Sequence, residues 1–561
     1  MFERFRSFIF TTIQSPLKRR SILLGTLVAF VLSVLMLAPS KMVLAKMLPG
    51  KNNDTFSIYT TLKSGSSIEQ THKVTECVCN ILKQESEVTD IEVFSGMGAP
   101  LDFAGLIKGS HFKNSENVAE IVVNLTKKHN RDEPSYFMIQ RLRPAIMQSC
   151  SSIFDSTKIS FVEPPAGPPV LAAIVAEIYG SDADGIRELS NKVASIFKNT
   201  SGLVDVEVMQ DDFYDTYEII VDSTKAALSG IDVKQINDIM YLAFEGMQIA
   251  VKNSDHYDDQ IPIFLTLSQQ TKTLSSSNLA SVRSKLSSLK MMNAQGMMIP
   301  LSELATITPK RSNPMIMSKN LHQMSNVMAE TDMVSQVYPL MEARDSIISS
   351  LSGDYEIEKV GLFDLKLTDK QNARIYDLKW DGEMKVTLDT FVDLGGAFIA
   401  ALVLIFLLMV IYYKSFTLSG IVLLGSFLSI IGVIVGHFIM DLFSHDTFFL
   451  TATSLIGFIA LIGISSRNSL LLIDFTASLM RDELMSKPEA IAYATATRAK
   501  PIFLTAAAII LASTLLAGDA VFGGLGVALI FGTIAAVVAS LVVVPVLMQM
   551  SDLRKHLHIE E

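Results

Sequence analysis

Six apolar segments constrain the fold of this chain more than any other feature of its sequence. A transmembrane helix needs roughly 20 mostly apolar residues. One such segment lies near the N-terminus and five crowd the last third of the chain, at residues 22–44, 392–413, 418–440, 448–475, 501–517 and 521–550. The residues between the first and second segments have the composition of a soluble domain. The sequence therefore predicts a six-span membrane protein with one large extramembrane domain.

The N-terminal segment admits two interpretations. Its basic start and the residues Val-Leu-Ala at 43–45 resemble a signal peptide with its cleavage site. The apolar run is longer than a signal peptide needs, and five further spans follow, which favours a retained first span at 21–46. Residues 1–20 mix aromatic and basic side chains and predict an amphipathic helix at the membrane interface.

The basic residues of the short loops predict the orientation of the spans. Lys and Arg in short loops mark the cytoplasmic side of a membrane protein. They fall before the first span, after the second, between the fourth and fifth, and after the sixth: Lys18, Arg19, Arg20, Lys414, Arg481, Lys487, Arg498, Lys500, Arg554 and Lys555. We therefore expect a bacterial inner-membrane protein with both termini in the cytoplasm and the large domain in the periplasm.

Composition excludes several classes of function. The net charge of −10, from 47 Lys and Arg against 57 Asp and Glu, argues against a nucleic-acid partner. No Gly-rich motif followed by Lys and Ser or Thr is present, which argues against ATP as the energy source. The three cysteines (Cys77, Cys79 and Cys150) are too few for a disulfide framework, and Cys77 and Cys79 face apart on a helix. We expect no disulfide framework and no metal role for them.

Strand and helix patterns in the extramembrane domain repeat the order βαββαβ, the split βαβ unit. The first unit is predicted from strands at 55–62, 89–94, 119–125 and 159–162 and helices at 67–84 and 136–148. After the Pro-rich residues 164–169 the pattern restarts, with strands at 171–179, 204–209, 217–221, 320–329 and 355–360 and helices at 184–197 and 337–350. Residues 232–311 look like an insertion in this second unit.

One charged residue lies deep in a predicted span. Placing Arg467 near a helix centre costs roughly 2.5–3.5 kcal/mol unless a carboxylate offsets it. Asp474 is on the same face but two turns nearer the cytoplasm, so Arg467 either extends toward the cytoplasm or pairs with another chain. His437 is expected to be a structural histidine. Thr505 could bond across helices or back to its own helix.

Five motifs accompany this architecture, namely Met-Leu-Pro at 47–49 followed by residues 56–71, and the segments 463–468, 500–505, 518–525 and 531–533. Together they resemble the C-terminal half of resistance–nodulation–division (RND) multidrug efflux transporters of the AcrB-like type. In that family a Lys usually occupies the position of Arg467. The family's paired aspartates belong to the half that this chain does not contain. The resemblance therefore suggests a split transporter whose two halves are made separately, with a degraded gene as the alternative.

The resemblance implies a fold of six membrane helices beneath two ferredoxin-like porter units with a docking-like insertion. Its implied boundaries are 47–165 for the first porter unit, 166–231 and 312–365 for the second, 232–311 for the insertion, 366–390 for a connector, 391–551 for five spans and 552–561 for a cytoplasmic tail. The implied partners are an N-terminal-half subunit carrying the Asp pair, two further copies in a trimer, a periplasmic adaptor and an outer-membrane channel.

The same resemblance implies a proton antiporter rather than an enzyme, with no cofactor. It would export hydrophobic or amphiphilic compounds from the periplasm or the inner-membrane leaflet. Arg467 and Thr505 would belong to the proton relay. Substrates would enter a cleft between the porter units, with Phe94, Phe103 and Leu106 as candidate lining residues. The Gly-rich loop 95–109 beside it is either a flexible lid or a plain surface loop.

Two alternative functions remain. Thioethers bind Cu(I) and Ag(I), and eight methionines lie in or beside the insertion: Met291, Met292, Met297, Met298, Met315, Met317, Met324 and Met328. They suggest metal efflux, although Met also fills irregular cores. The other alternative is a membrane scaffold or secretion accessory that has lost its proton-relay half.

Overall fold

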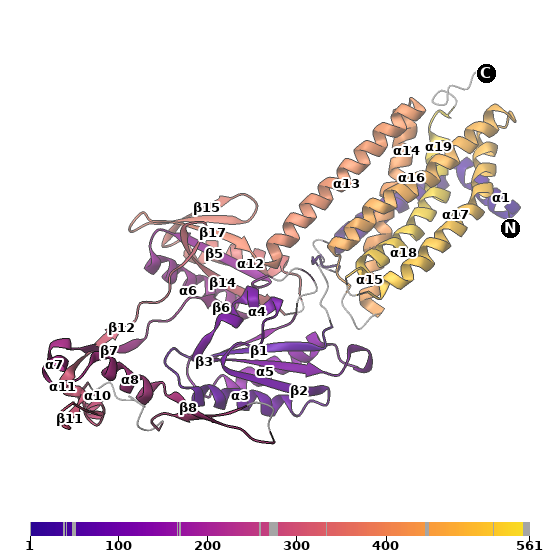
Figure 1. Ribbon diagram of the computed structural model, residues 1–561. Coiled ribbons are helices and arrows are strands. Elements are labelled where there is room, and N and C mark those ends of the chain that lie inside the picture. The colour runs from indigo at the N-terminus through magenta and orange to yellow at the C-terminus, as the bar shows by residue number, and fades with distance from the viewer. Residues whose placement is uncertain are drawn as a thin grey trace. The chain divides into compact units, whose positions relative to one another are not determined.

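The computed structural model describes residues 2–37, 40, 42–47, 52–164, 167, 170–256, 260–268, 279–332, 334–443, 448–519 and 521–553. The chain divides into two compact units (Figure 1). One comprises Asp211–Met315, and the other contains the rest of the chain, including the membrane helices and both porter units. The Pro-rich residues 164–169 lie largely outside the described residues.

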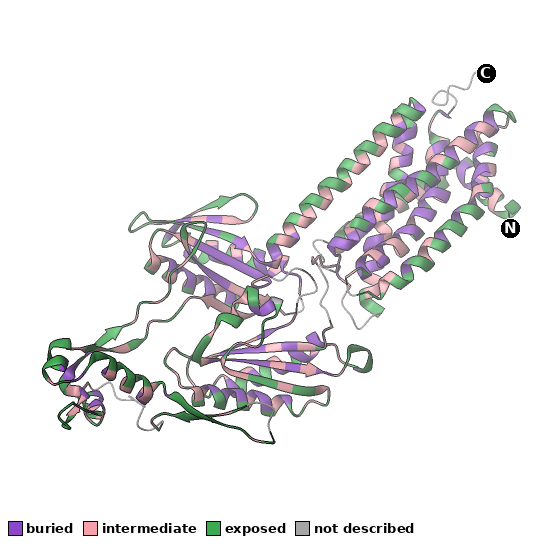
Figure 2. Cartoon of the chain, viewed as in Figure 1, coloured by how far each residue is buried: buried purple, intermediate pink, exposed green. Residues whose placement is uncertain are grey.

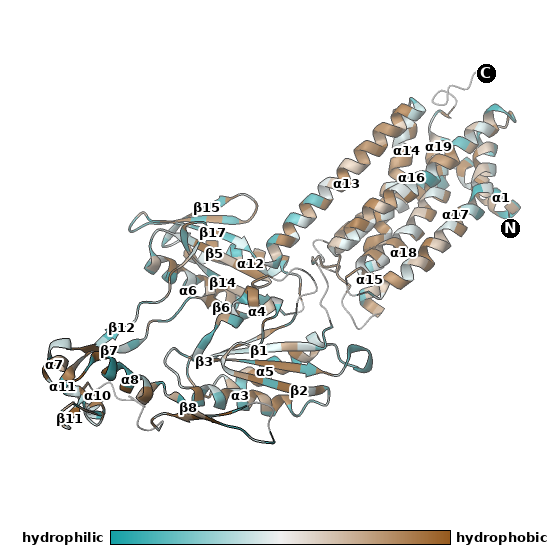
Figure 3. Cartoon of the chain, viewed as in Figure 1, coloured by the Kyte–Doolittle hydropathy of each residue, from teal (hydrophilic) through white to brown (hydrophobic). Residues whose placement is uncertain are grey.

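Within the described residues, six helical spans are long and apolar enough to cross a membrane, as the sequence predicts (Figure 3). Two of the spans are each built from consecutive helices, and a π-helical turn (Ala539–Val543) interrupts the last one. The helices are α2 (Pro16–Leu37), α13 (Glu383–Tyr413), α14 (Phe416–Phe427), α15 (Ser429–Phe443), α16 (Ala452–Arg481), α17 (Lys487–Ala517), α18 (Gly523–Val538) and α19 (Val544–Met550).

Small residues bring α15, α16 and α18 close together. A methyl group added at Gly432 would meet the backbone of Phe531, and one at Gly532 would meet the side chain of Leu461. Such glycines let membrane helices approach closely. In contrast, α2, α13 and α17 expose most of their apolar residues (Figure 2). Among the described spans, the bundle therefore has a packed interior and three helices with largely uncovered faces.

One helical boundary and the packing of one helix differ from the sequence prediction. The fifth span begins at Lys487 rather than at residue 501, because Ala490, Ile491 and Ala494 are buried there although charged residues lower the hydropathy. The N-terminal helix α1 (Phe2–Gln14) buries Ile9 and Ile13 in the same apolar cluster of the bundle. Its apolar face therefore packs on protein.

The first porter unit has the predicted βαββαβ order. Its strands are β1 (Thr55–Thr61), β2 (Val88–Met97), β3 (Asn114–Leu125) and β4 (Lys158–Val162), in the spatial order β2-β3-β1-β4. All pairs are antiparallel, and Ile58 lies opposite both Ile121 and Phe161. Helices α3 (Ile68–Leu82) and α5 (Ser135–Cys150) cover one face of the sheet (Figure 1). Alternating apolar residues form its core.

A disulfide joins the two helices of this unit, a pairing that the sequence analysis does not predict. Cys77 on α3 bonds to Cys150 on α5, with an S–S distance of 2.05 Å. The two residues are 73 positions apart, so their meeting depends on the packing of α3 against α5. Cys79 points to another face and is a free, buried thiol.

The second porter unit is built around a seven-stranded sheet. Its path runs β13-β14-β5-β17-β16-β15, and β6 pairs with β14. Its helices are α6 (Ala183–Asn199) and α12 (Val337–Leu351), and its strands are β5 (Ile174–Gly180), β6 (Leu203–Met209), β13 (Met317–Lys319), β14 (His322–Thr331), β15 (Tyr355–Val360), β16 (Asp364–Asp369) and β17 (Ile375–Asp381).

Part of the expected connector 366–390 belongs to this sheet. Strands β16 and β17 lie between β15 and β5, and α13 begins at Glu383. In β17, the buried residues Tyr376, Leu378 and Trp380 alternate with exposed residues. This alternation is the pattern of a strand with one buried face. The connector is therefore a β-hairpin of the second porter unit followed by the start of a membrane helix.

The unit Asp211–Met315 contains the remaining elements. They are β7 (Asp215–Val221), α7 (Ser223–Leu228), α8 (Val233–Phe244), β8 (Met247–Lys252), β9 (Ile261–Leu265), α10 (Leu279–Ser287), β10 (Lys290–Met292), β11 (Met298–Pro300), α11 (Leu301–Leu304) and β12 (Ala305–Arg311). Strand β7, assigned from sequence to the second porter unit, pairs with β12 instead. The two strands lie near opposite ends of this unit's sequence, so no local sequence pattern predicts that they pair.

Candidate functional site

Arg467 lies on an exposed face of α16. The helix begins at a capping box in which the Thr451 hydroxyl accepts from the Ser454 backbone N–H. The exposed residues recur at helical spacing: Ile456, Ala460, Gly463, Arg467 and Leu471. No ion pair involves Arg467 within the part of the chain that the structure describes. We call this set of five residues the α16 face.

Asp474, on the same helix, bonds to groups other than Arg467. Its carboxylate accepts hydrogen bonds from the hydroxyls of Tyr412, at 3.2 Å, and Tyr413, at 2.9 Å. Tyr413 also donates to the carbonyl of Leu470 at 3.3 Å. These bonds tie the end of α13 to α16. The charge of Arg467 is therefore not offset by this carboxylate in a direct ion pair.

Thr505 lies on an exposed position of α17. Its hydroxyl donates to the carbonyls of Pro501, at 3.1 Å, and Ile502, at 3.0 Å. It therefore bonds back to its own helix, the second of the two arrangements expected from sequence. No hydrogen bond between Thr505 and Arg467 occurs among the described residues. The structure places both side chains on the exposed surface of the bundle without joining them.

His437 is fully buried in α15, and its Nδ1 lies 3.3 Å from the carbonyl of Phe448. This single backbone contact fits the structural role expected from sequence. Among the described residues, no group of three His, Cys, Asp or Glu side chains is arranged to hold a metal ion.

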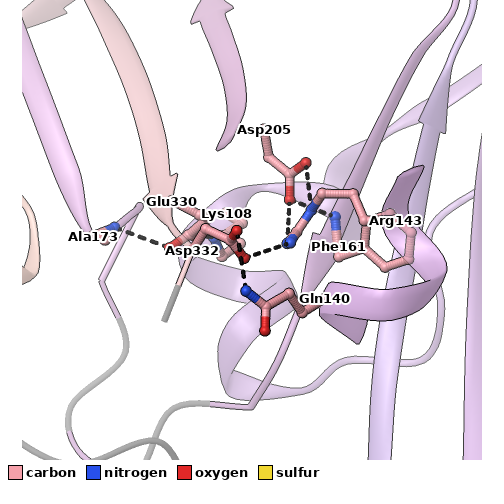
Figure 4. A network of polar contacts seen from close by, with 8 residues as sticks. All are labelled: Lys108, Gln140, Arg143, Phe161, Ala173, Asp205, Glu330 and Asp332. Carbon is pink, nitrogen blue, oxygen red and sulfur yellow. Dashed lines mark hydrogen bonds and ion pairs between the residues drawn. The ribbon is translucent and has the colours of Figure 1, made fainter. Parts of the chain in front are cut away.

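A second polar site joins the two porter units (Figure 4). Arg143 on α5 forms a two-point contact with Asp205 on β6, with Nε–Oδ1 at 3.2 Å and Nη2–Oδ2 at 3.1 Å. The backbone N–H of Phe161 also donates to Asp205, at 3.2 Å. Asp332 takes part through Arg143 Nη1 at 3.5 Å and Gln140 Nε2 at 3.3 Å. One arginine thus connects a helix of the first unit to the sheet of the second.

Lys108 makes a separate connection at the end of α4 (Phe103–Lys108). Its Nζ donates to Glu330 Oε1 and to the carbonyl of Leu171, both at 2.8 Å. The other carboxylate oxygen of Glu330 accepts from the backbone N–H of Ala173 at 3.2 Å. We call this set of contacts, together with those of Arg143, the porter junction (Figure 4).

Burial perturbs the pKa values of one acid of this junction, Asp205, and of the neighbouring acid Glu163. It raises the pKa of Glu163 to about 7, although the charges of Lys46 and Arg143 act in the opposite direction. It also raises the pKa of Asp205, and Arg143 partly offsets that effect. Carboxylates removed from water need such cations to remain ionised. Burial therefore disfavours the charged forms of Asp205 and Glu163, and the nearby charge of Arg143 offsets part of that free-energy cost.

The candidate cleft residues from sequence belong to two elements, β2 and α4. Phe94 on β2 is half-buried, and Leu106 on α4 is 41% exposed. The side chain of Phe103 is outside what the structure describes. Sequence reasoning missed Lys108, Arg143, Asp205 and Glu330. For Arg143 and Asp205 the available signal was a charged residue inside a predicted helix (136–148) or strand (204–209). Lys108 and Glu330 lie in the predicted loop 95–109 and just after the predicted strand 320–329, where a charged residue is no signal.

The chain belongs to the AcrB/AcrD/AcrF family, which it matches over residues 1–551. Members of this family are RND efflux transporters, which are secondary transporters and not enzymes. The family match confirms the resemblance to RND efflux transporters that the sequence motifs suggested. The structure confirms the predicted fold of six membrane spans with an α+β extramembrane domain.

Individual relatives share limited identity with the chain. It is 24% identical over 379 residues to the swarming motility protein SwrC of Bacillus subtilis, covering 66% of this chain and 32% of that protein. It is 22% identical over 518 residues to the multidrug export protein AcrF of Escherichia coli, covering 90% of this chain and 45% of AcrF. The chain thus spans less than half the length of these curated relatives.

A crystal structure of a heavy metal efflux pump shares the fold. The TM-score is 0.69 at 19% identity, and the match covers 97% of this chain and 52% of that one. At this identity the match supports the fold and carries no information on the substrate.

Proposed function

We propose that this chain is the second half of a proton-driven efflux transporter, and that a separate complementary subunit supplies carboxylates that pair with Arg467. The observation that carries the proposal is the α16 face, where a cation in a membrane span has no ion pair among the described residues. Such a charge is stable in a bilayer when a partner or water reaches it. A helix bundle carrying carboxylates at the same depth meets that requirement.

Arg467 would act as a fixed charge. A guanidinium keeps its proton at every physiological pH, so the titrating groups must belong to the complementary half. When those carboxylates are ionised they attract Arg467, and when they are protonated the attraction weakens. Each proton would therefore shift the position of α16 relative to the partner helices. Thr505 would add a hydroxyl to this path by rotating away from its own helix.

The orientation that we propose places the porter units in the periplasm. Disulfides persist in oxidising compartments and are rare in the cytosol, which supports this location for Cys77–Cys150. Reporter fusions after Ser415 and Arg481 should be active as cytoplasmic markers, and a fusion at Gly353 as a periplasmic marker. A cytoplasmic result at Gly353 would reverse the proposed orientation.

The assembly that we propose contains three copies of each half, bound to a periplasmic adaptor and an outer-membrane channel. The unit Asp211–Met315 would provide the docking contact, because it forms a compact body of its own. Its hairpin of β8 and β9 exposes apolar side chains that a partner could cover: Met247, Ile249, Val251, Ile263, Phe264 and Leu265.

Dye efflux tests the proposed function. Cells without other multidrug pumps would express this chain with a complementary RND half and would be loaded with a cationic amphiphilic dye. Efflux should require both halves and should stop when an uncoupler collapses the proton gradient while cellular ATP is maintained. Efflux that continues without the gradient would contradict proton drive. Stable assembly without any efflux is the result expected of the scaffold alternative.

A second candidate function is export of Cu(I) or Ag(I), favoured by one hairpin. Strands β10 and β11 place Met292 opposite Met298, so both thioethers lie on one exposed face of the hairpin. The Asn293 side chain accepts from the backbone N–H of Met297 at 2.9 Å and orders the turn. Silver sensitivity decides between the candidates, because replacing Met292 and Met298 by Leu should impair silver resistance only if this hairpin handles metal.

A further inference from the structure

Helix α1 has one side packed on protein and another side that is uncovered. Ile9 and Ile13 are each 1% exposed, and they share an apolar cluster with Ile491 near the start of α17. Figure 1 shows α1 beside α17. Arg4 and Phe8 lie on a different side of α1, where Phe8 is 53% exposed. The protein therefore holds α1 in place and leaves this outer side open.

The N-terminal residues carry a positive charge that the chain as a whole does not share. Residues 2–20 contain five basic residues and one acidic residue, although the net charge of the chain is −10. Arg6 forms an ion pair with Glu3 at 3.5 Å, so these two charges offset each other. Three further basic residues are exposed and form no ion pair within the part of the chain that the structure describes: Arg4, Lys18 and Arg20.

Large apolar side chains accompany these exposed cations. Phe8 lies one helical turn from Arg4 on the same side of α1. Leu17, which is 79% exposed, precedes Lys18 in the first turn of α2, and Ser15 alone separates the two helices. We call the exposed residues of this corner the α1 surface: Phe2, Arg4, Phe8, Leu17, Lys18 and Arg20.

The α1 surface lies at one end of the membrane spans. Helix α2, which begins here, is the first span. The apolar cluster that contains Ile9 also contains Tyr413 at the end of α13 and Met480 near the end of α16. A span of about 20 residues crosses the hydrocarbon core, so the ends of spans lie at the depth of the lipid headgroups. Basic and apolar side chains combined at that depth contact headgroups and acyl chains together.

We propose that the α1 surface binds anionic phospholipids. The headgroup phosphate contacts Arg4 and Lys18, and the acyl chains cover Phe8 and Leu17. Charge selects the class of lipid, because Lys and Arg near a membrane attract lipids with a net negative charge and zwitterionic lipids offer none. This binding is independent of the transported compound and of the complementary half, so it adds a ligand class that the proposed function does not contain.

Fluorescence quenching in vesicles of one fixed composition tests the proposal. The full-length chain with Phe8→Trp is reconstituted in phosphatidylcholine that contains phosphatidylglycerol, with bromine carried either by the phosphatidylglycerol or by an equal amount of the phosphatidylcholine. Bromine quenches a nearby tryptophan, and the parent protein corrects for Trp380. Phosphatidylglycerol should occupy the α1 surface at least about fivefold in preference to phosphatidylcholine, because one Lys or Arg near a membrane contributes about that factor.

Two pairs of substitutions show whether the exposed cations create this preference. Arg4→Gln with Lys18→Gln should bring the preference close to one, whereas Arg4→Lys keeps the charge and should retain it. Lys414→Gln with Arg481→Gln is the matched control, because it removes two exposed cations from the same end of the bundle but outside α1 and α2. This control should keep the preference of the Phe8→Trp protein.

Three results would overturn the proposal. The first is equal quenching by the two brominated lipids, and the second is a preference that survives Arg4→Gln with Lys18→Gln. The third is an equal loss in the Lys414 and Arg481 control, which would show a general effect of charge at this end of the bundle. Excess inorganic phosphate should leave the preference unchanged, and its loss would mean that the surface takes a free anion instead of a lipid.

Discussion

The cations of the porter junction form ion pairs, whereas Arg467 in the membrane bundle forms none among the described residues. At the junction, Lys108 and Arg143 find carboxylates of the same chain within 2.8 to 3.5 Å. In the bundle, Arg467 lies on the α16 face without an ion pair among the described residues. The cost of an unpaired charge is greater in a membrane than at a partly hydrated junction. The comparison shows that Lys108 and Arg143 are paired within this chain outside the membrane, and it motivates the proposal that a complementary half pairs with Arg467 within the membrane.

Loss of Arg467 should have the largest effect. Arg467→Ala should abolish efflux by the complete assembly, because the carboxylates of the complementary half would lose their fixed counter-charge. Arg467→Lys should retain part of the activity, since it keeps the cation. The measurement is dye efflux at equal amounts of membrane-inserted protein. Arg481→Ala, at the cytoplasmic end of the same helix, is the matched control and should export normally. Normal export by Arg467→Ala would show that the unpaired charge of Arg467 has no role in efflux.

Loss of Arg143 should have the largest effect on stability. Arg143→Leu leaves Asp205 buried without its cation, a change that typically costs about 3–5 kcal/mol. The apparent melting temperature of the purified complex should fall, and proteases should cut the porter units sooner. Arg141→Leu is the matched control, because exposed ion pairs contribute about 1 kcal/mol or less. Equal losses from the two variants would show that the buried Arg143–Asp205 pair contributes no more than an exposed ion pair.

Removal of the disulfide should have an intermediate effect. Replacing Cys77 and Cys150 together by Ser should destabilise the first porter unit by roughly 2–4 kcal/mol, because the bridge restricts the unfolded chain. A reducing agent should lower the melting temperature of the parent protein and leave that of the double variant unchanged. If the reductant affects both proteins equally, it acts elsewhere and the bridge does not stabilise the unit.

The pH dependence of stability should show the most gradual effect, because it is spread over more than two pH units. Glu163 has its pKa raised from 4.5 to about 7, so the folded chain holds this proton more tightly than the unfolded chain does. Stability should therefore fall as the pH rises from about 4.5 to 7, by at most ~1.4 kcal/mol per pH unit, and should then level off. Glu163→Gln should flatten this part of the profile of melting temperature against pH. An unchanged slope would show that other groups determine it.

Sequence patterns predict those features that depend on local periodicity. The six spans and the alternation in β1, β3 and β4 follow from residues close together in the chain, and so does the exceptional position of Arg467. Features that depend on distant partners escape this reasoning. The Cys77–Cys150 bridge, the insertion of β16 and β17 between β5 and β15, and the Lys108–Glu330 pair each join segments whose proximity is set by packing.

The mass of the detergent-solubilised native assembly tests the central claim most directly. With the complementary half co-expressed, the account predicts a complex that contains both halves in equal numbers, three of each, and the same protein expressed alone should not form a transport-competent assembly. A stable homo-oligomer of this chain that exports substrate with the proton gradient would contradict the account. Its proton carrier would then have to be an acidic group of this chain, and Arg467 would need no outside partner.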